Sequence, residues 1–130
     1  MGFFAATFSG GGSGTLTRLA VLRYESKSGK IVNLLPFEAV TNVSDRAMWM
    51  VPEASAYPVL VDADFIWGEG ETHFDSHFYD ISAWKFDAAI DKFVKALSYQ
   101  TPKKYRGGDD SPIRVLAAER GEIIRRLSSK

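Results

Sequence analysis

The sequence predicts an α+β fold: an antiparallel β-meander of about five to six strands, followed by two C-terminal helices packed on the sheet. Three observations lead to this fold class. Short β-rich apolar segments separated by turn residues fill residues 1–80, apolar residues then recur at helical spacing, and all strands precede both helices. With 130 residues, the chain suits a single domain that spans residues 1–130.

The first half of the chain is punctuated like successive β-hairpins. Apolar segments over residues 3–8, 16–24 and 31–37 are separated by a glycine-rich stretch and by a turn sequence at residues 26–29. The glycine-rich stretch, residues 10–14, is not followed by the lysine that a Walker phosphate-binding loop requires. We therefore interpret it as a flexible hairpin loop.

The strand predicted most clearly covers residues 59–67. Its residues alternate, so that one face is wholly apolar while the other carries the carboxylates of Asp62 and Asp64. Shorter strands are expected over residues 47–51 and 72–79. Four aromatic residues of these three strands are expected in the core: Trp49, Trp67, Phe74 and Phe78.

The second half of the chain is predicted as two helices joined by a loop. Ser82 can cap a helix over residues 82–99, because the apolar residues that follow it recur at helical spacing. Residues 101–110 contain proline and glycine and are expected as a loop. A proline at the first position suits a second helix over residues 112–127, whose apolar stripe has Arg120 at its centre. The apolar positions of the first helix are Phe86, Ile90, Phe93, Val94 and Leu97.

Charge is distributed unevenly along the chain, although the formal net charge is zero. Residues 45–91 carry ten acidic and two basic residues, whereas residues 92–130 carry ten basic and four acidic residues. Such blocks either pair with each other in the folded protein or leave unneutralised patches on its surface. The two outcomes imply different functions.

An exposed acidic face leads to our main functional hypothesis, a non-catalytic protein that binds a partner protein with a basic surface. Its carboxylates would steer the basic partner, and an exposed tryptophan on the polar side of the first helix would supply buried contact. An inhibitor, immunity or adaptor protein that acts on a nucleic-acid-handling partner is the concrete form of this hypothesis. The expected binding residues are Asp62, Asp64, Glu69, Glu71, Asp75, Asp80 and Trp84.

Two other function classes stay open at this stage. A nucleic-acid-binding module would use the basic C-terminal segment, where lysine and arginine residues accompany an aromatic residue. These residues are Lys103, Lys104, Tyr105, Arg106, Arg114, Arg125 and Arg126. A metal-dependent hydrolase would use His73, His77 and Asp80, although these side chains converge on one ion only if the segment is helical.

The composition excludes several kinds of site and partner. The chain has no cysteine, which excludes disulfides, thiolate metal sites and thiol catalysis and fits a cytoplasmic location. No apolar run approaches the roughly 20 residues of a membrane-spanning helix, so we expect no membrane partner. We expect no cofactor, and a homo-oligomer stays open.

Overall fold

The structure is a computed structural model of the chain. It describes residues 2–9, 15–35, 39–41, 45–72, 74–106 and 115–129, with the backbone alone over residues 2–9, 15–19, 39–41 and 45–47.

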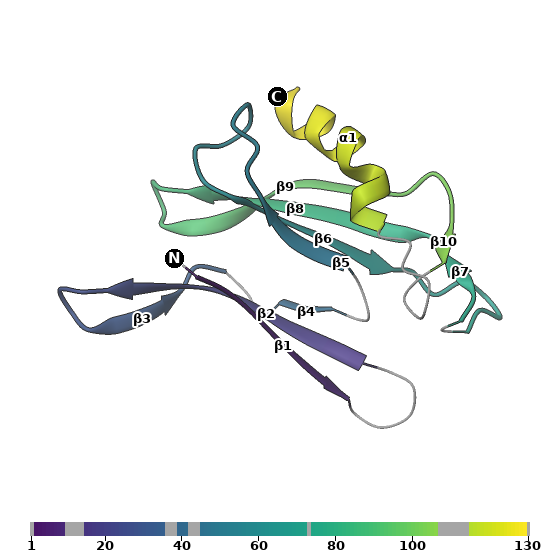
Figure 1. Cartoon of the computed structure of the whole chain (residues 1–130), viewed down its shortest axis with the longest axis horizontal. Coiled ribbons are helices and arrows are strands. Elements are labelled where there is room, and N and C mark those ends of the chain that lie inside the picture. Colours follow the sequence, from purple (N-terminus) through teal and green to yellow (C-terminus); the bar gives the residue numbers. More distant parts are fainter. Residues whose placement is uncertain are drawn as a thin grey trace.

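The described residues form three layers (Figure 1). The outer sheet contains β1 (Gly2–Ser9), β2 (Thr15–Glu25), β3 (Lys30–Asn33) and β4 (Ala39–Thr41). The central sheet has the order β5 (Asp45–Trp49), β6 (Val59–Phe65), β8 (Tyr79–Asp87) and β9 (Lys92–Gln100). The helix α1 (Val115–Ser128) covers the other face of the central sheet, and β7 (Ser76–His77) pairs with β10 (Tyr105–Arg106) at its end.

All strand pairs are antiparallel, as the α+β prediction requires. The prediction of one continuous meander is wrong, because the strands divide into an outer sheet, a central sheet and a two-stranded pair. Dividing the strands between two sheets buries more apolar surface than a single sheet would, since the central sheet is then covered on both faces, by the outer sheet and by α1. Among the described residues no helix is long and apolar enough to cross a membrane.

The core is built around β6, which is buried on both faces. Val59, Val61 and Ala63 pack towards α1, in a cluster that includes Ile123 of the helix. Leu60 instead packs towards the outer sheet, in a second cluster whose other buried members are Val21, Leu34, Leu35, Trp84 and Phe93. Each large aliphatic side chain removed from water in this way contributes about 1.5–3 kcal/mol.

The predicted helix over residues 82–99 is wrong: this segment belongs to the β8–β9 hairpin. Ala83 pairs with Leu97, but the next residue, Trp84, pairs with Lys95, so Ala96 is an extra residue in β9. Such a β-bulge changes which face the following side chains occupy. Phe93 therefore packs towards the outer sheet and Leu97 towards α1.

This bulge explains why the segment resembles a helix in the sequence. A regular strand places residues four apart on the same face, whereas here Phe93 and Leu97 belong to different clusters. Ile90 lies in the hairpin turn and is 60% exposed. The helical spacing therefore combines two faces of a hairpin with a turn residue.

The second predicted helix is confirmed from residue 115 onwards, while its expected start at residue 112 lies outside the described residues. Its buried face is displaced by one position from the predicted stripe. Glu119, not Arg120, lies at the centre of the buried face, and Arg120 is exposed with its guanidinium 4.5 Å from the centre of the Trp49 ring. Glu119 accepts hydrogen bonds from the hydroxyls of Tyr99 (3.0 Å) and Tyr105 (2.6 Å), which ties α1 to β9 and β10.

Candidate binding surface

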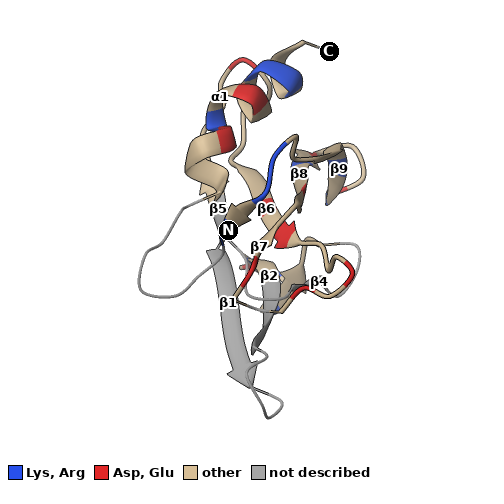
Figure 2. Cartoon of the chain, turned by 90° about the vertical axis from the view of Figure 1, so that its right-hand side faces the viewer, with Lys and Arg blue, Asp and Glu red and all other residues tan. Residues whose placement is uncertain are grey.

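The candidate site is the loop over residues 66–75, which follows β6 and precedes β7 at one end of the central sheet. Figure 2 shows this end of the molecule facing the viewer, with Asp and Glu residues in red around β7. Three of the partner-binding residues expected from the sequence, Glu69, Glu71 and Asp75, lie in this loop. Two exposed aromatic residues, which the sequence did not assign to binding, also lie here.

The carboxylate of Glu71 connects the first half of the loop to β7 and to the segment before β10. Glu71 accepts a hydrogen bond from the backbone N–H of Gly68 (2.8 Å) and lies 2.7 Å from Nδ1 of His77. Its other oxygen accepts a hydrogen bond from the ammonium of Lys104. A Cβ on Gly68 would lie 2.5 Å from the Glu71 carboxyl carbon, so the close approach favours glycine at that position.

Glu71 is the negatively charged member of this network. The hydrogen bond from Lys104 and that from the Gly68 backbone lower the pKa of Glu71 to about 2, so the carboxylate is ionised at neutral pH. An ionised carboxylate only accepts hydrogen bonds, and Nδ1 of His77 must therefore donate. His77 is 1% exposed, and its Nε2 has no hydrogen-bond partner among the described residues.

A tight turn orients the second half of the loop. The Thr72 backbone N–H donates to the Asp75 carboxylate (2.6 Å), and the Phe74 N–H donates to the Thr72 hydroxyl (3.3 Å). The hydrogen bond from the Thr72 backbone lowers the pKa of Asp75. The turn leaves the Phe74 side chain 66% exposed.

Trp67 is the second exposed aromatic residue of the loop. Its ring is 48% exposed, yet it packs edge-on against Phe65 (5.2 Å between ring centres) and His77 (5.5 Å). The sequence placed Trp67 and Phe74 in the core, and for both residues this prediction is wrong. β6 ends at Phe65, so the inward–outward alternation stops before Trp67. We call Trp67, Glu69, Phe74 and Asp75 the acidic–aromatic surface.

The structure separates the other expected binding residues. Asp80 is exposed, and Asp64, which pairs with it across β6 and β8, is half-buried. Asp62 is buried within the central sheet. Trp84 is 7% exposed and packs between the two sheets, so the exposed anchor expected at this position is a core residue, because the segment is a strand and not a helix.

The basic residues expected to contact nucleic acid are largely engaged with their own protein. Lys104 binds Glu71, and both Arg125 and Arg126 hydrogen-bond to Glu122 (2.6–2.8 Å). Lys103 lies over the ring of Tyr105, which is buried. Arg106 is exposed, and Arg114 lies outside the described residues.

The expected metal ligands do not form a group in the part of the chain that is described. His73 lies outside the described residues, and Nδ1 of His77 is engaged by Glu71. No three His, Cys, Asp or Glu side chains among the described residues are arranged to hold an ion.

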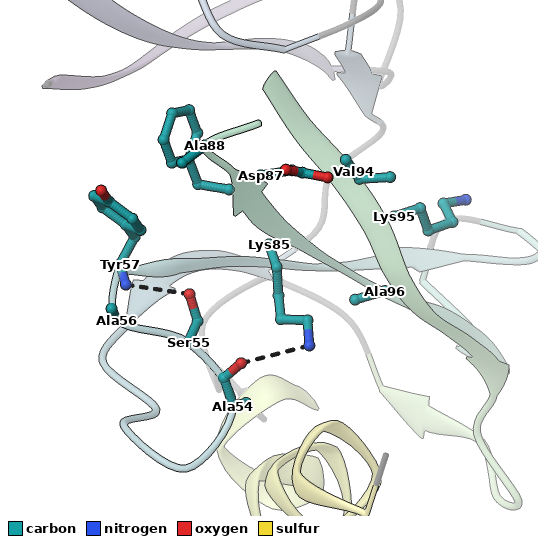
Figure 3. Close-up of a pocket in the computed structure, with 11 residues that line it drawn as sticks. Ala54, Ser55, Ala56, Tyr57, Lys85, Asp87, Ala88, Val94, Lys95 and Ala96 are labelled. Carbon is teal, nitrogen blue, oxygen red and sulfur yellow. Dashed lines mark hydrogen bonds between the residues drawn. The ribbon is translucent and has the colours of Figure 1, made fainter. Parts of the chain in front are cut away.

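An open cavity of about 540 Å³ lies elsewhere, between residues 54–57 and the β8–β9 hairpin (Figure 3). Tyr57 and Phe86 meet edge-on at one side of it (4.9 Å between ring centres), and the Lys85 ammonium points to the Ala54 carbonyl (3.4 Å). None of the residues that the sequence assigned to binding lines this cavity.

Comparison with protein-family models, with curated proteins and with solved structures finds no match for this chain.

Proposed function

We propose that this chain is a non-catalytic binding protein that engages a basic partner protein through the acidic–aromatic surface. The observation that carries the proposal is that Trp67 and Phe74 are exposed on the same loop as two exposed carboxylates, Glu69 and Asp75. A few residues supply most of the binding energy at protein interfaces, and tryptophan is enriched among them. Glu69 and Asp75 would steer a basic partner towards the two aromatic residues.

The hydrogen bonds beneath the loop support the same proposal. A loop that is already ordered loses less conformational entropy when it binds, so more of the contact energy appears as affinity. Glu71 orders the first half of the loop through Gly68, His77 and Lys104, and Asp75 orders the second half through Thr72. Glu71 thus acts as a positioning residue for the surface.

The class of partner follows from the charge of the surface. Carboxylates spaced along a loop can occupy a groove built for phosphates, so we propose an inhibitor, immunity or adaptor protein that acts on a nucleic-acid-handling protein. The same surface repels nucleic acid itself, since it carries the same charge sign as phosphate. A cysteine-free chain is compatible with the cytoplasm, where we place this interaction.

The test is capture of the partner by the immobilised full chain from a lysate of its host, read by mass spectrometry and repeated with paired variants. Trp67→Ala with Phe74→Ala, and separately Glu69→Lys with Asp75→Lys, should each abolish capture of the protein that the wild type retains. Raised salt should weaken capture by the wild type.

Two matched controls make this result specific. Ile90→Ala removes an equally exposed apolar side chain from the β8–β9 turn, and Glu53→Lys reverses an exposed charge on another loop. Both should leave capture unchanged. Capture that survives both loop variants, or that Glu53→Lys weakens as much as the loop reversal does, would overturn the proposal.

A further inference from the structure

Among the described strands, β1 forms one edge of the outer sheet. This strand pairs with β2 along its whole length, from Gly2 opposite Leu22 to Ser9 opposite Thr15. No other described strand pairs with it, because β3 and β4 both pair with the opposite edge of β2. Figure 1 shows β1 at the outside of the outer sheet. In an antiparallel strand about half of the backbone N–H and C=O groups point to each edge, so a row of them points away from β2 along β1, and no described strand pairs with them.

β1 lacks the features by which proteins protect an open edge. Charged residues, prolines and bulges usually prevent such an edge from pairing with another chain. The β1 sequence GFFAATFS contains no charged residue and no proline, and its register with β2 is continuous. β9, by contrast, has two of these features. It pairs only with β8 among the described strands, and it contains the charged residues Lys92 and Lys95 and the bulge at Ala96.

We infer that β1 pairs antiparallel with β1 of a second copy of this chain. A two-fold axis brings identical strands together, and like charges directly opposite each other destabilise such a pair. β1 itself contains no charged side chain, so its self-pairing places no like-charged side chains opposite each other. The pairing joins two four-stranded outer sheets into one continuous sheet. It does not involve the acidic–aromatic surface and does not depend on the function proposed for it.

The experiment is analytical ultracentrifugation of the full chain between about 1 and 200 µM, where mass action makes a reversible dimer visible. The wild type should approach twice the chain mass of 14.4 kDa as concentration rises. Ala6→Lys and Ala6→Glu, placed near the middle of β1, should each raise the dissociation constant at least ~10-fold through repulsion across the two-fold axis. An equimolar mixture of the two variants should recover the dimer, since opposite charges then face each other.

Ser98→Lys and Ser98→Glu on β9 are the matched controls, and circular dichroism checks that all four variants are folded. Both Ser98 variants should dimerise like the wild type. A wild type that keeps the mass of one chain throughout would overturn the inference. A dimer that the Ala6 variants leave intact, a mixture that stays monomeric, or a dimer that the Ser98 variants disrupt would also overturn it.

Discussion

Replacing Trp84 by alanine tests the assignment of residues 79–100 to a hairpin between two layers. The Trp84 side chain is 7% exposed and packs in the cluster with Leu60 and Phe93. Removing a buried tryptophan costs about 3–5 kcal/mol, from lost burial and from the cavity left behind. Ile90 is 60% exposed in the hairpin turn, so Ile90→Ala should change stability by no more than about 0.5 kcal/mol.

The contrast between the two variants separates the hairpin from the helix that the sequence favours. On that helix Ile90 lies in the buried stripe and the tryptophan on the polar side, so the order of the two effects would be reversed. Urea unfolding followed by far-ultraviolet circular dichroism gives both free energies of unfolding, provided that the slopes stay equal. A greater loss for Ile90→Ala than for Trp84→Ala would refute the hairpin and the account of the bulge.

Three further predictions concern the ionisable contacts. Burial and the hydrogen bond to Glu119 raise the pKa of Tyr105 to about 12, so the stability that this group contributes is present below pH 10 and lost as the pH rises towards 12. Tyr105→Phe should lower the free energy of unfolding at pH 7 by about 1.5–3 kcal/mol. It should also reduce the fall in the free energy of unfolding that the wild type shows above pH 10. Urea unfolding that gives the variant and the wild type the same fall above pH 10 would contradict this. The hydrogen bond from Lys104 lowers the pKa of Glu71 to about 2, so the stability that Glu71 contributes is present above pH 4.5 and lost as the pH falls towards 2. The NMR chemical shift of the Gly68 backbone amide, which donates to Glu71, should therefore change with a midpoint near pH 2. A midpoint near pH 4.5 would count against the network. Asp91 has a positive φ of 58° and binds Arg23, so Asp91→Ala should lower Tm more than Arg23→Ala does, whereas equal losses would show that the backbone conformation adds nothing.

Sequence patterns correctly predicted the elements in which the spacing of apolar residues matches the secondary structure along the whole element. The strand over residues 59–67 is found as β6 because its alternation is regular and its neighbours are antiparallel strands. The C-terminal helix is found because apolar residues recur at helical spacing on both sides of Arg120. The sequence placed Arg120 at the centre of the stripe, whereas Glu119 occupies that position because the hydroxyls of Tyr99 and Tyr105 donate hydrogen bonds to its buried carboxylate.

The errors arise where tertiary structure determines the outcome. A single extra residue, Ala96, gives β9 an apolar spacing that resembles a helix, and only the pairing with β8 reveals it. At the candidate surface, Glu69 and Asp75 were proposed from charge alone, and both are exposed. Trp67 and Phe74 were missed because hydrophobicity predicts burial; the two glycines that flank Glu69 were the available signal that the strand ends before them.

Hydrogen–deuterium exchange of the full chain, with and without the captured partner, tests the central claim most directly. The account predicts slower exchange of backbone amides over residues 66–75 in the complex, and no change over the C-terminal turns of α1. Slower exchange in α1 or around the cavity beside Tyr57, with residues 66–75 unaffected, would contradict it.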